Sequence, residues 1–312
     1  MSDAKSGVPT KAHLAPRDLA LILAVVAVWG YAFVAIKVAL TEVPPFALAA
    51  VRFFCAAVPM VFFVKRPTLP WRSIAGYGLA IGVFQFGLLF LGMRLGMPAG
   101  LTSIVIQAQV FITMGLAVLF VGDHFHRHNL IASIVAAIGL GVLAASKVLA
   151  GLSGTFIGFL LVLLAALSWA IGNIVAKRGA GDHGADMFAL VIWSSLIPPI
   201  PLALLSFLFE GGAATVVQQV AAMSWKGWAC VAMMSYGATL FGFGSWAVLM
   251  HRYPTALVSP FALLIPVTGV ASGALFLGET LTSLQMAGAA LVFVGLAINV
   301  FAPYLSRARY NL

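Results

Sequence analysis

Long apolar runs occupy nearly the whole sequence, and only short polar breaks separate them. Hydrophobic residues make up 62% of the 312 residues and charged residues 8%, whereas a soluble domain carries about 25% charged residues. A hydrocarbon core of about 30 Å needs roughly 20 helical residues, because each residue adds about 1.5 Å. The sequence therefore predicts an all-α integral membrane protein, and its composition excludes a water-facing globular enzyme domain.

Cutting the apolar runs at charges and at Gly and Pro clusters predicts ten transmembrane helices. They lie at residues 19–40, 44–64, 73–92, 98–121, 129–147, 155–176, 186–209, 227–250, 255–278 and 283–302. Basic residues precede the first run, as in a signal peptide, but the run continues to residue 40 without a small-residue cleavage site. We therefore expect this first helix to be retained.

The basic residues predict how the helices are oriented. If the N-terminus is cytoplasmic, 12 of the 17 Lys and Arg residues fall in cytoplasmic segments and three in the opposite loops, while Lys37 and Arg52 fall within helices. The positive-inside rule then places both termini in the cytoplasm. The net charge of +9 thus reports topology, and we expect no nucleic-acid partner.

The two halves of the chain resemble each other. Residues 98–123 align with residues 254–279 at a single offset of 156, and each stretch closes with a glycine and an acid. Trp29 and Lys37 are eight residues apart, as are Trp169 and Lys177. Because five helices per half is an odd number, the second copy must enter the membrane inverted, as in many secondary transporters.

This repeat predicts the domain organisation. We expect two inverted five-helix repeats around a central cavity, at residues 19–147 and 155–302, with cytoplasmic tails at 1–18 and 303–312. Polar groups in hydrocarbon are costly, so polar side chains inside the predicted helices are the first candidates to line that cavity.

Polar and aromatic residues recur every four positions on two of the predicted helices. They are Trp29, Phe33 and Lys37 on the first helix, and Trp169, Asn173 and Lys177 on the sixth. Such a spacing gives each helix one stripe, which is suited to lining a shared cavity. In the alternative, the aromatic rings pack between helices and the lysines snorkel to the headgroups.

Other helices contribute further candidates. Gln107 and Gln109 lie about 200° apart on their helix, so we expect one to face the cavity and the other to bond a neighbouring helix. The full set of candidate substrate-binding residues is Trp29, Phe33, Lys37, Arg52, Gln85, Gln107, Gln109, Trp169, Asn173, Trp193, Ser194 and Tyr236.

None of the eight acids lies within the middle of a predicted helix, so the sequence offers no obvious proton relay in the membrane. Lys37 and Arg52 then lack an acidic partner there, and a substrate carboxylate would supply the missing charge. This favours an anionic or zwitterionic metabolite. The alternating His124, His126 and His128 are more typical of an interfacial loop than of a metal site. We expect no catalytic residue, metal or cofactor.

Five stretches resemble a known family. They are GMPAGLTSIVIQAQVF (96–111), SWAIGNIVAKR (168–178), VIWSSLIPPIP (191–201), RYPTALVSPFALLIPVTGVAS (252–272) and LQMAGAALVFVGLAINVF (284–301). They resemble the EamA-like family of the drug/metabolite transporter superfamily, and within it most resemble bacterial exporters of cysteine and O-acetylserine. The similarity covers about residues 18–302. The chain departs from the family pattern at Asp123, where the family usually has Glu.

The resemblance implies a bacterial inner-membrane transporter that exports small amino-acid metabolites by alternating access. Export of other amino acids or of aromatic compounds is the nearest alternative, since likeness of fold does not fix a ligand. A membrane enzyme acting on lipid-linked substrates would need clustered carboxylates or histidines at one membrane face, and the acids here are scattered. Oligomeric state and energy source stay open, and a monomer is compatible with this architecture.

Overall fold

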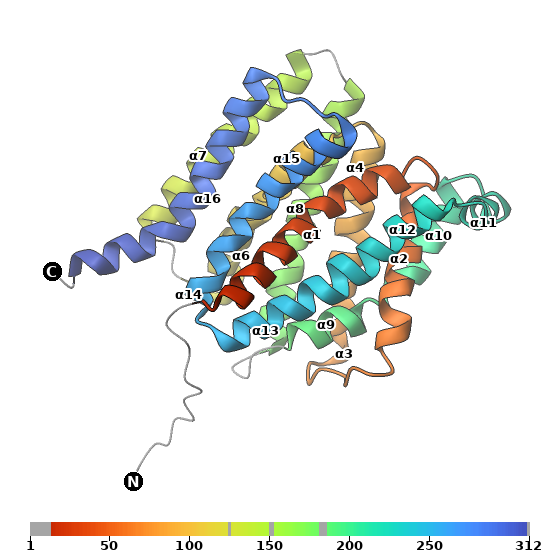
Figure 1. Ribbon diagram of the computed structural model, residues 1–312, viewed down its shortest axis with the longest axis horizontal. Coiled ribbons are helices and arrows are strands. Elements are labelled where there is room, and N and C mark those ends of the chain that lie inside the picture. The colour runs from red at the N-terminus through yellow and green to blue at the C-terminus, as the bar shows by residue number, and fades with distance from the viewer. Residues whose placement is uncertain (1–13, 124–125, 150–152, 181–185, 311–312) are drawn as a thin grey trace, which may run out of the picture.

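The computed structural model describes residues 14–123, 126–149, 153–180 and 186–310, and these contain helices and no β-strand (Figure 1). The first half comprises α1 (Pro16–Ala39), α2 (Pro45–Met60), α3 (Trp71–Tyr77), the π-helical η1 (Gly78–Gln85), α4 (Phe86–Arg94), α5 (Ala99–Val105), α6 (Ala108–Val121) and α7 (Arg127–Leu149). The second half comprises α8 (Ser153–Ala180), α9 (Met187–Ser194), α10 (Pro199–Phe209), α11 (Ala213–Ala221), α12 (Trp225–Ala232), the π-helical η3 (Met233–Phe243), α13 (Gly244–Arg252), α14 (Thr255–Val258), the 3-10 helix η4 (Ser259–Leu263), α15 (Leu264–Leu277) and α16 (Ser283–Tyr310).

Each predicted segment coincides with one helix or with a run of consecutive helices. Seven helices of the described chain are long and apolar enough to cross a membrane, and the pair α9 and α10, bent by 41°, is an eighth if it forms one span. Helix α2 is apolar but shorter, at 16 residues. The predicted all-α membrane fold is thereby confirmed, while the count of ten spans stays a prediction.

Three details differ from the predicted segments. The segment 186–209 is a bent pair because Pro198 and Pro199 lie at the break, and proline cannot donate the backbone hydrogen bond that would continue the helix. A short additional helix, α11, forms in the segment expected to be a loop. The last helix, α16, continues to Tyr310, beyond the expected end at residue 302.

Glycine allows several helices to approach closely. A Cβ atom at Gly82 would lie 1.9 Å from Pro198 Cγ, and one at Gly139 would lie 2.7 Å from the Gly288 carbonyl oxygen. Helix η1 therefore packs directly on the bend between α9 and α10, and α7 packs directly on α16. Gly141 differs, because a Cβ there would meet nothing within 4 Å.

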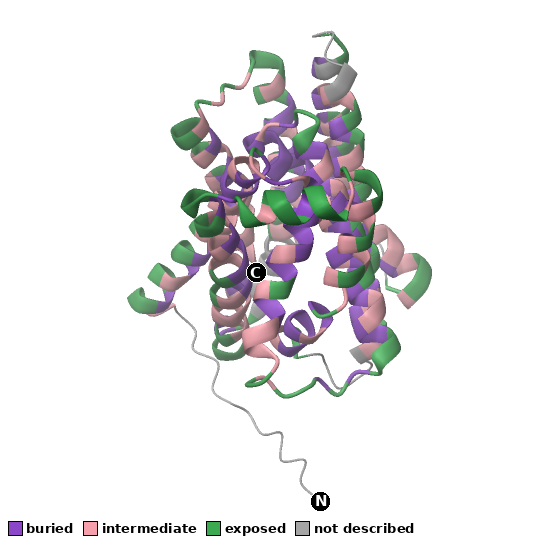
Figure 2. Ribbon diagram, turned by 90° about the vertical axis from the view of Figure 1, so that its right-hand side faces the viewer, coloured by how far each residue is buried: buried purple, intermediate pink, exposed green. Residues whose placement is uncertain are grey.

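The surface of the bundle is apolar. Buried residues gather where the helices face one another, and exposed ones lie on the outside (Figure 2). Large apolar side chains are nevertheless among the exposed residues, including Phe63 at 82% and Leu275 at 79%. Large apolar side chains exposed in this number suit lipid rather than water. Helices α7 and α16 form a side-by-side pair along one edge of the bundle (Figure 1).

Successive helix runs alternate in direction, so the bundle has two ends. The end of α1 lies beside the end of α4, where Lys37 bonds Met93, and Glu279 lies there too, against the start of α5. We call this the Glu279 end. The start of α1 lies at the opposite end with Arg252, and there Asp123 pairs with Lys177. We call this the Asp123 end.

Candidate functional site

A cavity of about 170 Å³ lies among helices from both halves of the chain. It is bounded by α1, α2, η1, α4 and the break between α5 and α6 on the first half, and by α8, η3 and α15 on the second. Its lining residues are Trp29, Phe33, Ile36, Arg52, Gln85, Phe86, Leu89, Ile106, Gln107, Trp169, Met234, Ala238, Thr239, Phe243 and Ile265. The wall is mostly aromatic and aliphatic, with a few polar groups, which is the usual make-up of a small-molecule site.

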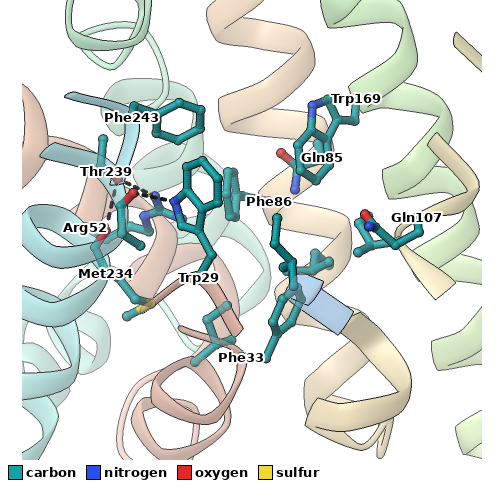
Figure 3. Close-up of a pocket in the computed structure, with 15 residues that line it drawn as sticks. Trp29, Phe33, Arg52, Gln85, Phe86, Gln107, Trp169, Met234, Thr239 and Phe243 are labelled. Carbon is teal, nitrogen blue, oxygen red and sulfur yellow. Dashed lines mark hydrogen bonds between the residues drawn. The ribbon is translucent and has the colours of Figure 1, made fainter. Parts of the chain in front are cut away.

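Half of the twelve predicted site residues lie on this wall. They are Trp29, Phe33, Arg52, Gln85, Gln107 and Trp169 (Figure 3). Trp29 is fixed by its indole Nε1, which donates a 2.9 Å hydrogen bond to the Ala238 carbonyl oxygen. Its ring also contacts Phe243 and Trp246, at centroid distances of 5.4 and 5.3 Å. These contacts hold an aromatic face in a set position on the wall.

The structure does not bring Lys37 to the cavity. Its Nζ donates to the carbonyl oxygens of Met93 at 2.7 Å and Met97 at 3.1 Å, beyond the cavity at the Glu279 end. Glu279 also acts on it electrostatically. The stripe from Trp29 to Lys37 is therefore divided, because its aromatic part faces the cavity and its lysine caps the end of α4.

The remaining predicted residues make other contacts. Asn173 donates to Gln109 Oε1 at 3.1 Å and to Thr113 Oγ1 at 3.2 Å, which ties α8 to α6. Gln107 lines the cavity while Gln109 bonds this neighbouring helix. Trp193 donates to the Val64 carbonyl oxygen at 2.9 Å. Tyr236 of η3 is 45% exposed and does not line the cavity.

Ser194 lies next to the cavity rather than on it. It donates to the Val191 carbonyl oxygen at 3.2 Å and borders a second, smaller pocket of about 30 Å³. Arg52, Phe86, Thr239 and Phe243 line both pockets, so they form the partition between them. A ligand in the main cavity therefore meets this partition and not Ser194.

Several wall residues escaped the sequence analysis. They are chiefly apolar, namely Ile36, Phe86, Leu89, Ile106, Met234, Ala238, Phe243 and Ile265. An apolar side chain inside an apolar helix carries no contrast that marks its face. Thr239 is the polar residue among them, and the sequence carries a signal for it. Ser235 and Thr239 are four residues apart, so they place two hydroxyls on one helix face.

Irregular helices surround the cavity, and they recur at the sequence offset of 156. The π-helical η1 (78–85) corresponds to residues 234–241, which lie within η3 (233–243). The break after α5 at Gln107 corresponds to residue 263, where η4 ends. π-Helical turns are rare and occur frequently at functional sites. Both halves thus depart from regular α-helix where they face the cavity.

Arg52 is the charged residue on the wall. Its side chain is 5% exposed, and its Nη2 donates to Thr239 Oγ1 at 3.0 Å. The guanidinium carbon lies 4.1 Å from the centroid of the Phe86 ring and 4.6 Å from that of Phe53. Within the described chain, its Nε is buried without a hydrogen-bond partner. Ser235 Oγ donates to the Arg52 carbonyl oxygen at 2.9 Å, so η3 holds this turn of α2 in place.

The comparisons with known proteins agree with this architecture. The model of the EamA-like transporter family matches residues 17–145 and 156–301. The chain belongs to the EamA-like transporter family. The matches cover most of the chain, and the resemblance seen in the sequence is confirmed. Among the described residues, no group of three or more His, Cys, Asp and Glu side chains is arranged to hold a metal, and His124 lies outside those residues.

Curated relatives resemble the chain over almost its full length. A protein of Salmonella typhimurium named "Probable amino-acid metabolite efflux pump" is 44% identical over 290 residues, covering 91% of this chain and 95% of the relative. A protein of the same name from Escherichia coli is 43% identical over 286 residues, with the same coverage. A transporter of Bacillus subtilis, "Uncharacterized transporter YoaV", is 26% identical over 290 residues, covering 90% of this chain and 95% of the relative.

A solved crystal structure shares the fold. It superposes with a TM-score of 0.61 at 16% sequence identity, covering 92% of this chain and 96% of the other. At this identity the likeness concerns the fold alone.

Proposed function

We propose that this protein exports small amino-acid metabolites across the bacterial inner membrane, with O-acetylserine and cysteine as its first substrates. The observation that carries the proposal is the cavity, which is walled by both family-matched segments and has polar groups set in an aromatic lining. The names of the 44% and 43% identical relatives support the same substrate class. O-acetylserine and cysteine follow from the resemblance of the five sequence stretches described above.

The proposed architecture has ten transmembrane helices in two inverted repeats, at residues 19–147 and 155–302. The recurrence of π-helical and broken segments at an offset of 156 supports it. So do Gly122 and Gly278, which end α6 and α15 with positive φ angles of 81° and 65°. With both termini cytoplasmic, the Asp123 end faces the cytoplasm and the Glu279 end faces outward.

The proposed mechanism is alternating access, in which the two halves rearrange about the cavity so that it opens to one side at a time. Trp29, Phe33 and Trp169 would shape the site, and the amides of Gln85 and Gln107 would orient the substrate. The narrow cavity suits a small metabolite, and its aromatic faces attract an ammonium group by about 0.5 to 2 kcal/mol.

Export of aromatic amino acids is the second candidate, and the aromatic wall favours it. Trp29, Phe33, Phe86, Trp169 and Phe243 all line the cavity, and aromatic rings also stack on aromatic ligands. The two candidates differ in the size of the substrate side chain, so a substrate panel separates them.

The test is flux of radiolabelled O-acetylserine and cysteine in proteoliposomes, with an aromatic amino acid as comparison. We expect saturable flux of the first two compounds. A second series adds an imposed pH gradient, and flux that ignores the gradient would identify a facilitator. Flux of the aromatic compound alone would refute the proposed substrate, and no flux of any amino acid would refute the proposed class.

A further inference from the structure

No acid of the described chain balances the charge of Arg52. Of the eight acids, Asp3 and Asp182 lie outside the described residues. The other six all bind groups elsewhere, namely Asp18, Glu42, Asp123, Asp186, Glu210 and Glu279. The ion pairs recorded across the described chain join Lys177 to Asp123 and Arg252 to Asp18. A buried cation without an anion is costly, so an anion from outside the chain would stabilise it.

The Arg52 guanidinium has aromatic rings on one side. The centroids of the Phe86 and Phe53 rings lie 4.1 and 4.6 Å from the guanidinium carbon and 5.4 Å from each other, so both rings approach the guanidinium from the same side. The N–H groups lie along the edge of the guanidinium, and they make the directional contacts with an anion. Planar guanidinium edges match the two oxygens of a carboxylate in a fork of paired hydrogen bonds. The site is therefore suited to a carboxylate.

Two buried amides lie on the same cavity wall as Arg52. The side chains of Gln85 and Gln107 are 2% and 8% exposed, and neither makes a hydrogen bond within the described part of the chain. In Figure 3, Arg52 and Thr239 lie on one side of the cavity, while Gln85 and Gln107 lie on the other. Each amide offers donors and an acceptor. Among the described residues, Arg52 Nε is the buried side-chain polar atom without a partner, so the amide atoms of Gln85 and Gln107 are open to the cavity that they line. A ligand that spans the cavity would bind them.

We infer that Arg52 binds the carboxylate of the exported substrate and that Gln85 and Gln107 bind the polar groups at its other end. The substrate class is then a small monocarboxylate with a hydrogen-bonding amino or acyl group and no second negative charge. This inference rests on the proposed function and adds to it the group of the substrate that the transporter selects. It also assigns the partner role to Arg52 alone of the two in-membrane cations, because Lys37 binds backbone carbonyls.

Thr239 positions Arg52 for this role. Its hydroxyl accepts from Arg52 Nη2 at 3.0 Å and donates to the Met234 carbonyl oxygen at 3.0 Å, five residues earlier in the π-helical η3. A regular α-helix would place its backbone bonds four residues apart. The π-helical turn thus positions the Thr239 hydroxyl, which binds one end of the Arg52 guanidinium.

The test is competition against saturable flux of radiolabelled O-acetylserine in proteoliposomes. The competitors are cysteine and cysteinamide. Cysteinamide carries a neutral carboxamide where cysteine carries its carboxylate. We expect cysteine to compete at least tenfold better in the wild-type protein, since one charge-assisted hydrogen bond is worth roughly 10- to 100-fold. In Arg52→Gln, O-acetylserine flux should fall by a similar factor and the two competitors should become equal. Arg52→Lys should be intermediate, because it keeps the charge and loses the fork.

The matched control is Lys177→Gln, which makes the same change at an exposed cation on the Asp123 end. It should keep the wild-type preference for cysteine. If Arg52→Gln carries too little flux to measure, binding is followed by tryptophan fluorescence, because Trp29 and Trp169 line the cavity. Circular dichroism of the same sample establishes that the variant is folded.

The outcomes separate the inference from the proposed function. Saturable O-acetylserine flux with equal competition by cysteine and cysteinamide in the wild type would overturn the inference and leave the function standing. An unchanged preference in folded Arg52→Gln would also overturn it. No saturable flux of any amino acid in the wild type would refute the proposed function itself.

Discussion

The two ends of the bundle are joined differently. At the Glu279 end, α5 packs directly on α15: a Cβ at Gly100 would lie 3.1 Å from Val270 Cα, and one at Gly269 would lie 2.5 Å from Ser103 Cβ. At the Asp123 end, the segments at the same repeat offset are α14 and α6, and in the described chain they have no comparable contact. A Cβ at Gly115 of α6 would meet nothing within 4 Å. The junction of α5 with α15 is thus tight, whereas its repeat-related counterpart at the Asp123 end is not packed in the same way. For this pair of junctions we call the Glu279 end the tight end and the Asp123 end the loose end.

The carboxylates at the two ends show the same contrast. Glu279 accepts hydrogen bonds from the backbone amides of Ala99 at 2.6 Å and Gly100 at 2.8 Å, which links the second half to the first. Asp123, its counterpart in the repeat, binds Lys177 in an ion pair whose side chains are 45% and 51% exposed. Aspartate is one methylene shorter, so its reach is shorter. In alternating access, the tight end would have to open and the loose end to close.

The largest expected effect is at Glu279. Glu279→Gln leaves one amide of α5 facing an NH₂ group, so we expect a loss of about 2 to 3 kcal/mol in the free energy of unfolding. Flux should also fall by about tenfold, because the state closed at this end is depopulated. Thermal unfolding in detergent and flux measure the two effects. Asp123→Asn is the matched control, and an equal loss there would show that the two ends do not differ.

The second prediction compares the two repeat-related lysines. Lys37→Met removes hydrogen bonds to two carbonyls and should lower the free energy of unfolding by about 1 to 2 kcal/mol. Lys177→Met removes an exposed ion pair and should cost about 0.5 kcal/mol or less. Both values come from denaturation of the purified variants. Equal costs would contradict the assignment of Lys37 to the tight end.

The third prediction asks what stabilises the loose end. Tyr253 donates to Asp18 Oδ2 at 2.6 Å and accepts from the Ala15 amide at 3.2 Å, which links α13 to the start of α1. Tyr253→Phe removes both bonds and keeps the ring, so we expect a loss of about 1 kcal/mol. A cost below that of Lys177→Met, in the same assay, would show that the exposed ion pair and not Tyr253 stabilises this end.

The smallest effect concerns pH at the Glu279 end. Hydrogen bonds from the hydroxyl and the backbone amide of Ser224 hold the pKa of Glu42 below its ordinary value. A carboxyl with a lowered pKa adds stability that is present above its unfolded-state pKa and is lost as the pH falls through its folded-state pKa. Ser224→Ala should therefore make the acid side of the stability profile shallower. An unchanged profile would show that Glu42 does not contribute to the pH dependence of stability.

The helices were predictable because apolar runs alone determine where they lie. The bend between α9 and α10 followed from no apolar pattern, yet Pro198 and Pro199 marked its place. The start of α16 at Ser283 matches the prediction, whereas its end does not. The sequence beyond residue 302 is less hydrophobic but still helical, so an apolar pattern ends before the helix does.

The site was predictable where a residue contrasted with its surroundings. Trp29, Arg52 and Gln85 stood out in apolar helices, and they lie on the cavity wall. Phe86 did not stand out, because it is an apolar residue in an apolar helix. The carboxylate contacts could not be predicted for another reason. Glu279 and Ala99 are 180 residues apart in the sequence, and only the fold brings them together.

A reversible disulfide across the tight junction tests the central claim that the halves must separate at the Glu279 end during transport. Gly100→Cys and Val270→Cys place one thiol on α5 and one on α15, in a background where Cys55 and Cys230 are replaced by alanine. The measurement is O-acetylserine flux in proteoliposomes before oxidation, after oxidation and after reduction. We predict that oxidation stops flux and that reduction restores it. Undiminished flux through the oxidised, cross-linked protein would contradict the claim.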